Sequence, residues 1–340
     1  MFLNTELFGH QRGASNKGYK KIKYGTMVLS TQNLHLGNAN VNLRFDHGMV
    51  SPAYKTYVIT GCSVDLIAQW IKSDAAKRFF YNATTVGASV CRRNVEWDTL
   101  YEQSLYLPCR DEQEKVAKFL GLLSNRINKQ QRFVSALKEY KRGAIQKLFS
   151  ETDMEQWNLV KLKDVVKVFD GTHQTPNYKT TGVRFISVEN ILDPLATQKY
   201  ISEDDYRKEF KVHPEYGDVL MTRIGDIGRT YYVNFDSDMA YYVSLALFKC
   251  SPKIEGRFLA AYISTNTFQK ELWERTLHIA FPKKINTGEI GECSIRLPSR
   301  ERQIAIASYL DVIEKKIRLA EKKLDLIQII KTGLMQQLFI

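Results

Sequence analysis

The sequence has little that is typical of a secreted or membrane-spanning protein. Its five cysteines are odd in number, lie far apart and form no Cys-x-x-Cys pair. That pattern argues against a disulfide framework and against a zinc site, and it favours reduced thiols. No apolar run approaches the roughly 18–20 residues that a bilayer requires. Residues 1–6 lack the basic and apolar segments of a signal peptide. We therefore expect a cytoplasmic protein that does not enter a membrane.

Enzyme motifs are also missing. The sequence contains neither Gly-x-x-x-x-Gly-Lys nor Gly-x-Gly-x-x-Gly, and its six histidines form no i, i+4 pair. Residues 193–195 begin with Asp-Pro but lack the second proline and the aromatic ring of an adenine methyltransferase site. Glu139-Tyr140-Lys141 has the Glu-x-Lys form of some nucleases, but it falls within a predicted helix. We expect no catalytic residue, no metal site and no cofactor.

The charge of the chain is strongly positive. The chain has 49 basic and 37 acidic residues in a length of 340, for a net charge of +12. An excess of this sign favours an acidic partner, most often nucleic acid. The block of residues 156–295 is nevertheless neutral, with 18 basic and 18 acidic residues. If this block binds nucleic acid, its basic side chains must be gathered on one face.

An internal repeat with an offset of 190 residues is the strongest pattern in the sequence. Leu107-Pro108 opens a segment that ends Leu148-Phe149, and Leu297-Pro298 opens one that ends Leu338-Phe339. No gap is needed between these ends. The segments before the two copies match more weakly, and residues 157–216 have no counterpart before Lys23. The repeat indicates that a domain and a connecting element were duplicated, and that the first domain is cut at its front.

Both copies of the repeat have the apolar spacing of a coiled coil. In each copy, apolar residues recur in alternating steps of four and three over four heptads. We expect the two helices to pair through the seam residues Leu120, Leu123, Ile127, Leu137, Leu310, Ile313, Ile317 and Ile327. Two amphipathic helices on separate cores are the alternative, but they would not need so strict a period.

Three segments of the second block carry candidate DNA-binding residues. Polar side chains after a predicted strand can donate to phosphates or base edges, and paired glycines allow close approach of flanking arginines. Plain solvated loops would have the same composition. The candidates in this block are Thr172, His173, Gln174, Thr175, Arg223, Arg229, Lys283 and Lys284. Arg92-Arg93 stands at the matching place of the first block and is a candidate for the same role.

Taken together, these features resemble the specificity subunit of type I restriction-modification systems. The resemblance is carried by the two Leu-Pro openings, by the endings 141–149 and 331–339, and by residues 157–162 and 171–176. It implies α+β target-recognition domains, with mixed sheet and short helices, that alternate with two long helices of an antiparallel coiled coil. The implied parts are a partial first target-recognition domain at 1–106, the first helix at 107–150, the second target-recognition domain at 151–296 and the second helix at 297–340.

The resemblance also implies a function without catalysis in this chain. Each target-recognition domain would read one half of a split sequence in double-stranded DNA. Two methyltransferase (modification) subunits would methylate adenine with S-adenosylmethionine, and a restriction/translocase subunit would supply ATP-driven translocation and cleavage. A full member of the family has about sixty more residues in front, so the first domain is expected to be truncated. Two alternatives remain: a coiled-coil adaptor without competent DNA recognition, and a nuclease with an unrecognised site.

Overall fold

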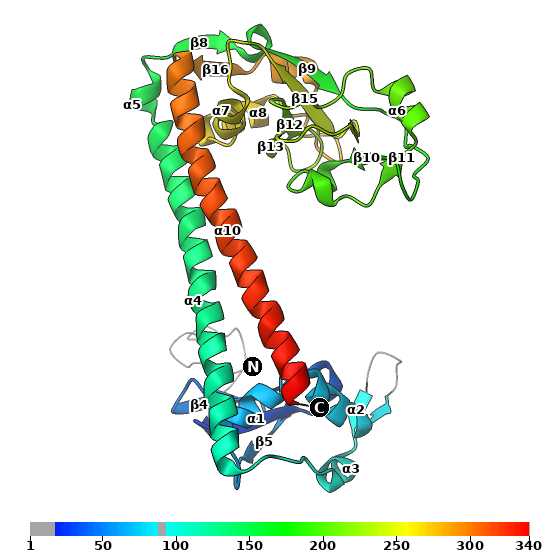
Figure 1. Cartoon of the computed structure of the whole chain (residues 1–340), viewed down its shortest axis with the longest axis vertical. Coiled ribbons are helices and arrows are strands. Elements are labelled where there is room, and N and C mark those ends of the chain that lie inside the picture. Colours follow the sequence, from blue (N-terminus) through cyan, green and yellow to red (C-terminus); the bar gives the residue numbers. More distant parts are fainter. Residues whose placement is uncertain (1–17, 88–92, 340) are drawn as a thin grey trace. The chain divides into compact units, whose positions relative to one another are not determined.

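The computed structural model describes residues 18–87 and 93–339, which form two compact units. Unit 1 combines Met1–Val134 with Leu319–Ile340, and unit 2 is Ser135–Arg318. Each unit contains a globular part and a portion of two long helices, α4 (Arg110–Leu148) and α10 (Arg300–Leu338), which are drawn in Figure 1. Within the described residues, no helix has both the length and the apolar character to cross a membrane.

The globular part of unit 1 is a small α+β domain. Its central sheet has the order β3-β2-β5, and both pairs are antiparallel. Two-stranded ladders join β1 to β4 and β6 to β7. Before α4 the elements are β1 (Lys20–Lys23), β2 (Thr26–Ser30), β3 (Ala39–Val41), β4 (His47–Val50), β5 (Tyr54–Val58), α1 (Val64–Trp70), α2 (Asp74–Asn82), β6 (Thr84–Val86), β7 (Arg93–Val95) and α3 (Trp97–Glu102).

The globular part of unit 2 is larger. A four-stranded sheet has the order β13-β12-β15-β9, and a second sheet has the order β11-β10-β14. A further ladder pairs β8 with β16. Between α4 and α10 the elements are α5 (Glu151–Met154), β8 (Asn158–Lys161), β9 (Val166–Asp170), β10 (Val183–Ile186), β11 (Tyr200–Ile201), α6 (Glu203–Glu209), β12 (Val219–Thr222), β13 (Thr230–Tyr232), β14 (Met239–Tyr241), β15 (Leu245–Cys250), α7 (Gly256–Ile263), α8 (Asn266–Glu274), α9 (Thr287–Gly291) and β16 (Ser294–Leu297).

The two long helices pack against each other in antiparallel orientation, which confirms the predicted coiled coil. In unit 1, Gln130 Nε2 donates to the carbonyl oxygen of Ala320 at 2.9 Å, and Lys331 Nζ donates to Ser124 Oγ at 2.7 Å. The residue number falls on α10 as it rises on α4, as an antiparallel pair requires. The predicted seam residues on α10 are buried, since Leu310, Ile313, Ile317 and Ile327 are each at most 9% exposed. On α4, Leu120 is fully buried, while Leu123, Ile127 and Leu137 are partly buried.

Sequence-equivalent residues make equivalent contacts at the two helix starts. Gln113 Oε1 accepts from the Ser63 N–H, and its Nε2 donates to the Pro108 carbonyl. Its counterpart Gln303 accepts from the Glu255 N–H and donates to the Lys253 and Pro298 carbonyls. Ser63 and Glu255 are the N-caps of the short helices α1 and α7. One buried glutamine therefore joins each long helix to the domain that precedes it.

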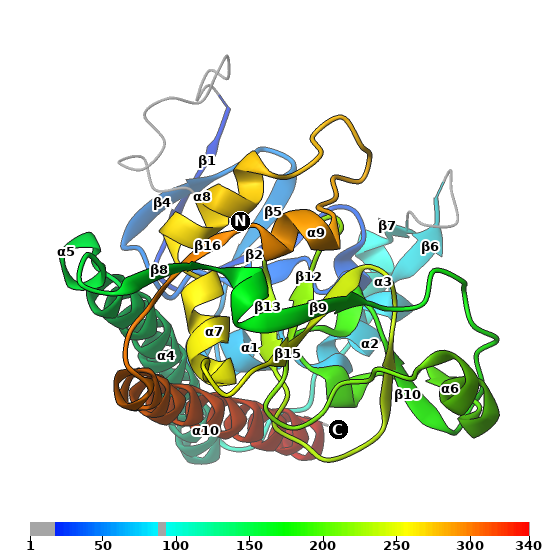
Figure 2. The ribbon, with the colours of Figure 1, turned by 90° about the horizontal axis from the view of Figure 1, so that it is seen from above.

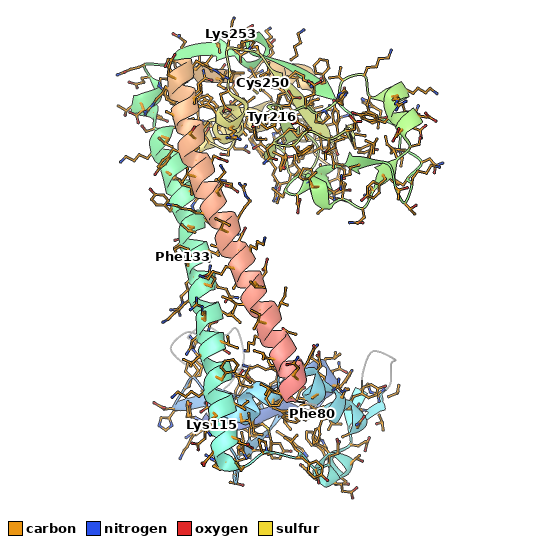
Figure 3. The ribbon with its side chains drawn as sticks, viewed as in Figure 1. Phe80, Lys115, Phe133, Tyr216, Cys250 and Lys253 are labelled. Carbon is orange, nitrogen blue, oxygen red and sulfur yellow. The ribbon has the colours of Figure 1, made fainter. Side chains whose placement is uncertain are left out.

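Each helix end is anchored in the same way. Phe149, one residue past α4, packs into the unit 2 core beside Phe258 and Tyr262. Its counterpart Phe339, one residue past α10, packs against the unit 1 core, which includes Phe80 (labelled in Figure 3). The phenylalanines of the repeated Leu-Phe endings thus fasten each helix to the core of the unit in which it ends.

We expect an acidic side chain at a seam position to unfold the helix pair. Ile313→Asp should lower the free energy of unfolding by about 3 kcal/mol or more, because a buried charge without a partner is costly. Leu123→Asp, at a half-buried position, should cost less. Val312 is adjacent but 50% exposed, so Val312→Asp should change stability by only about 0.5 kcal/mol. Denaturant unfolding followed by helix circular dichroism measures the difference, and equal stabilities of the Ile313 and Val312 variants would contradict the observed seam.

Candidate nucleic-acid interface

Three loops of unit 2 meet beside the end of β12. The first follows β9 and carries His173, the second runs from Arg223 to Arg229, and the third lies between α8 and α9 and ends at Lys284. The Gly225 N–H donates to the Lys283 carbonyl at 2.9 Å, and the Ile285 N–H donates to the Arg223 carbonyl at 3.0 Å. The second and third loops are thus joined through their backbones. Figure 2 shows the third loop leaving α8 and returning to α9.

The first loop is attached to the others through Asp170, the last residue of β9. Asp170 Oδ2 lies 3.0 Å from His173 Nε2 and 3.5 Å from a terminal nitrogen of Arg223. The Thr172 N–H donates to the Tyr241 carbonyl at 3.2 Å, so the start of this loop runs alongside β14. At Gly171 a Cβ atom would lie 2.1 Å from the Tyr241 carbonyl oxygen, so only glycine allows this approach.

Arg223 lies inside the protein, which corrects the expectation that it contacts bases. Its side chain is 8% exposed. Nε donates to the Ile285 carbonyl at 3.1 Å and a terminal nitrogen donates to the Val243 carbonyl at 3.0 Å. Burial lowers the pKa of this guanidinium, although Asp170 opposes the effect. Arg223 therefore holds the loops together and does not reach the surface.

The turn after Arg223 is held by Thr222, which is almost fully buried. The Arg229 N–H donates to Thr222 Oγ1 at 3.0 Å, and the Gly228 N–H donates to the Thr222 carbonyl at 2.9 Å. Gly228 has a φ of 92°, which favours glycine, and a Cβ there would require the Gln269 amide to move. The turn presents Arg229, whose half-exposed guanidinium pairs with Asp226 at 2.5 Å. This pair is open to solvent, so the guanidinium can exchange Asp226 for an external acceptor.

The remaining candidates of unit 2 are exposed on these loops. His173, Gln174, Thr175, Lys283 and Lys284 are exposed, and Thr172 is half-buried. Lys283 Nζ lies 4.2 Å from the centre of the Trp273 ring, which is itself 55% exposed. The structure thus gathers Thr172, His173, Gln174, Thr175, Arg229, Lys283 and Lys284 at one set of joined loops.

The sequence reasoning missed apolar side chains on the same surface. Ile279 and Phe281 are fully exposed at the tip of the third loop, at 99% and 104%. Trp273 supports Lys283 from α8. Phe281 stands two residues before Lys283 in the sequence, so an aromatic ring beside the two predicted lysines was the available signal. Exposed aromatic and basic side chains together are suited to nucleic acid, because rings stack on bases and cations pair with phosphates.

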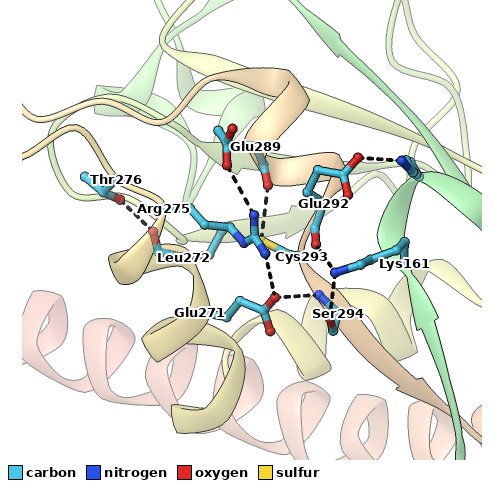
Figure 4. A network of polar contacts seen from close by, with 10 residues as sticks. Lys161, Glu271, Leu272, Arg275, Thr276, Glu289, Glu292, Cys293 and Ser294 are labelled. Carbon is cyan, nitrogen blue, oxygen red and sulfur yellow. Dashed lines mark hydrogen bonds and ion pairs between the residues drawn. The ribbon is translucent and has the colours of Figure 1, made fainter.

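A polar network fixes the base of the third loop (Figure 4). Arg275 at the end of α8 contacts Glu271 at 3.5 Å and Glu289 of α9 at 3.2 Å. Glu271 also accepts from the Ser294 N–H at 2.8 Å, and Lys161 Nζ donates to Ser294 Oγ at 3.1 Å. The network joins α8, α9, β16 and β8, so the loop extends from a rigid base.

The corresponding loop of unit 1 is different. Arg92 lies outside the described residues. Arg93 is half-buried, donates to Thr84 Oγ1 at 2.8 Å and to the Thr84 carbonyl at 2.7 Å, and lies 4.3 Å from the Tyr81 ring centre. These contacts hold β7 to β6 and occupy the guanidinium, so Arg93 is not available to a ligand in this conformation.

Comparisons with known proteins agree with this architecture. Residues 154–328, just over half of the chain, match the family model described as type I restriction modification DNA specificity domain. The chain belongs to this family.

A curated relative and two solved structures are similar over most of the chain. The specificity subunit of the type I restriction enzyme MjaVIII from Methanocaldococcus jannaschii is 25% identical over 287 residues, which are 77% of this chain and 67% of the relative. The type I S subunit from M. genitalium superposes with a TM-score of 0.61 at 13% identity, over 97% of this chain and 86% of that one. A chain from a structure of type I R-M complex assembly and conformational transition gives 0.59 at 17% identity, over 96% and 85%. At these identities the two structures establish the fold alone.

The two arginines of the second loop should differ in their contribution to the stability of unit 2. Arg223→Ala leaves the carbonyls of Ile285 and Val243 without a donor, and we expect a loss of about 3 kcal/mol in the free energy of unfolding of unit 2. Arg229→Ala removes an exposed ion pair and should cost about 1 kcal/mol or less. Thermal unfolding of the two variants checks this order, and a larger destabilisation by Arg229→Ala would refute the assignment of Arg223 to the interior.

Proposed function

We propose that this chain is the non-catalytic, sequence-reading subunit of a type I restriction-modification complex in the cytoplasm. In this proposal unit 2 contacts double-stranded DNA with its three joined loops, and α4 and α10 dock the modification subunits, with a restriction/translocase subunit in the complete assembly. The observation that carries the proposal is the backbone pairing of the Arg223–Arg229 loop with Lys283 and Lys284 beside the His173 loop. This pairing gathers donors and cations from a neutral block on one surface.

The loops divide into two kinds of contact. Among the described residues neither Lys283 nor Lys284 forms a salt bridge, and both stand on a rigid base, which suits contacts to phosphates that do not depend on sequence. Arg229, His173, Gln174 and Thr175 carry directional donors, which suit base edges in the major groove. We propose that the first group sets affinity and the second group sets preference among sequences.

Exposed apolar residues at equivalent positions of α4 and α10 support two partner surfaces. Leu122 is 60% exposed in unit 1, and its counterpart Val312 is 50% exposed in unit 2. Phe119 and its counterpart Tyr309 are 48% and 42% exposed on the same helix faces. Phe133, labelled on α4 in Figure 3, is 54% exposed as well. Exposed apolar side chains are hydrated unfavourably, and a group of them on a helix surface is typical of a protein–protein contact. We therefore propose that each half of the repeat binds one modification subunit.

A coiled-coil adaptor without DNA recognition is the second candidate. The engagement of Arg93 by Thr84 and Tyr81 favours it for unit 1, because Arg93 is the described residue at the place that matches Lys283 and Lys284, and its guanidinium is held by these contacts. For unit 2 the exposed cations of the third loop favour DNA binding.

DNA binding is tested with a mixed-sequence duplex and the complex of this chain with its modification subunits. The double variant Lys283→Ala/Lys284→Ala should reduce affinity for all sequences, and the slope of log affinity against log salt should fall by about 2, since each phosphate contact contributes about 0.9. Lys270→Ala is the control, because Lys270 is exposed on α8 and pairs with Glu274. Fluorescence anisotropy at several salt concentrations measures both quantities.

Two outcomes of this experiment, and one of a separate activity assay, would contradict the proposal. A complex that binds its modification subunits but no DNA would support the adaptor. An unchanged salt slope would show that Lys283 and Lys284 do not touch phosphates. Cleavage or methylation of DNA by the purified chain alone, with divalent metal or S-adenosylmethionine added, would show that the chain is itself an enzyme.

The two partner surfaces predict a stepwise loss of modification subunits. Leu122→Asp and Val312→Asp should each leave about one modification subunit bound, and the double variant about none, because a carboxylate in a desolvated contact is costly. Asn128→Asp introduces the same charge at another exposed position of α4 and should leave two subunits bound. Native mass spectrometry gives the stoichiometry, and two subunits on the double variant would refute this surface.

A further inference from the structure

The two units share one sheet plan, but unit 2 has a strand that unit 1 lacks among its described residues. In unit 2, β12 pairs with β15 from Val219↔Phe248 to Thr222↔Leu245. In unit 1, β2 pairs with β5 from Thr26↔Val58 to Ser30↔Tyr54, also antiparallel, after the matching glycine turn. β5 therefore occupies the place of β15. On its far side β15 pairs with β9, from Ala246↔Asp170 to Cys250↔Val166, whereas no described strand pairs with the far side of β5.

The burial of the two strands reflects this difference. Leu245, Ala246, Leu247 and Phe248 of β15 are all fully buried. None of the five residues of β5 is buried, and Val58 at its end is 81% exposed. A strand of a central sheet that is exposed in this way is an unprotected edge.

A second edge in unit 1 matches the place of β16. The offset of 190 residues relates Ser294–Leu297 of β16 to residues 104–107. In unit 2, β16 pairs with β8 from Ser294↔Lys161 to Leu297↔Asn158. In unit 1, Leu105 and Leu107 pack against the core while Tyr106 between them is 94% exposed, which is the alternation of a strand. No backbone pairing partner of residues 104–107 is found in the described part of the chain.

An unsatisfied side chain lies beside this second edge. Gln103 Nε2 is shielded from solvent and has no hydrogen-bond partner among the described residues. Its counterpart in unit 2 is Cys293, whose carbonyl accepts from the Leu162 N–H at 2.8 Å, where the chain leaves β8. A buried amide without a partner is rare, because its desolvation costs about 1–3 kcal/mol. At equivalent positions, then, Cys293 of unit 2 is paired with a further polypeptide segment, whereas Gln103 of unit 1 has a donor without a partner among the described residues.

A single segment of unit 2 fills both places. β8 and β9 are consecutive, and the 3-10 turn Leu162–Asp164 between them puts Leu162 fully inside the core. Lys161 at the end of β8 donates to the Glu292 carbonyl at 2.9 Å and to Ser294 Oγ at 3.1 Å, as drawn in Figure 4. The counterpart of Ser294 in unit 1 is Ser104, so a hydroxyl for such a lysine is present there too.

We propose that unit 1 binds a strand–turn–strand segment of another polypeptide chain, of the same kind as residues 158–170, along the edges formed by β5 and residues 104–107. The segment would supply backbone hydrogen bonds to both edges, an apolar side chain at the turn for the core, and a lysine for Ser104. This mode of binding is strand addition, in which the backbone provides affinity and alternate side chains provide selectivity. The proposal does not depend on whether unit 2 reads DNA.

A peptide of residues 157–170 is the probe, and hydrogen exchange of the full chain is the readout. Without peptide, the outward amides of β5 and residues 104–107 should exchange freely. With peptide in excess, they should exchange at least about tenfold more slowly, because bound strands protect the amides they pair with. The amides of β15 and β16 should be unchanged, since their partners β8 and β9 are already in place.

Backbone methylation of the peptide provides a matched control. The bond from Leu162 N to Cys293 O makes these residues a hydrogen-bonded pair, and such pairs alternate along an antiparallel ladder. Val160 is therefore in a hydrogen-bonded pair and Leu159 is not. N-methylation at Val160 should abolish the protection of residues 104–107, whereas N-methylation at Leu159 should spare it.

Each other result overturns the proposal. Protection of both edges before any peptide is added would mean that the chain itself or a second copy covers them, and sedimentation would tell these two apart. Equal binding of the two methylated peptides would exclude the proposed ladder. The same peptide can also be fused ahead of Met1 through a Gly/Ser linker, which raises its effective concentration to about the millimolar range. If neither the free nor the fused peptide protects the two edges, this segment is excluded as the occupant.

Discussion

The antiparallel pairing of α4 and α10 is the constraint on which the rest of the structure depends. Its seam is apolar except at a few positions, and two of these are equivalent lysines in different surroundings. Lys141 pairs with Glu314, whereas Lys331 donates to Ser124 and has its pKa lowered by burial and by Lys72. The surroundings of Lys331 in unit 1 thus disfavour its charged form, whereas Lys141 has a carboxylate partner in unit 2. The duplication kept the geometry of the seam and varied its chemistry.

The surface of unit 2 that we propose contacts DNA depends mainly on side chains that do not themselves reach the surface. The buried side chains of Arg223 and Thr222 tie together segments that are up to 62 residues apart in the sequence, and the exposed Asp170 adds an ion pair to Arg223. Because these ties use buried side chains and backbone atoms, the exposed ends of the loops can differ in sequence without loss of the base. Such an arrangement suits a domain whose loops select different DNA sequences on one scaffold.

The sequence predicts the helices well because their signal is local and periodic. The expected segments 107–150 and 297–340 contain helices of Arg110–Leu148 and Arg300–Leu338, and the seam follows the heptad positions. The burial of Arg223 could not be predicted, because its acceptors lie at Ile285 and Val243 and only the fold brings them near. The same holds for Arg93, whose partners are Tyr81 of α2 and Thr84 of the neighbouring strand β6. Charge in a loop indicates a surface, but only tertiary contacts decide which guanidinium is free. The division of the chain into four parts remains a prediction, because the compact units each take a share of both helices.

The central claim is that the joined loops of unit 2 read base sequence, and selection from a random duplex library tests it most directly. The complex of this chain with its modification subunits should enrich one short defined sequence after a few rounds. The same selection with Arg229→Ala should keep most of that sequence and lose preference at one position, since a base-directed arginine contributes about 1–3 kcal/mol of discrimination. Enrichment of no sequence by a complex that is intact and binds DNA would contradict the account.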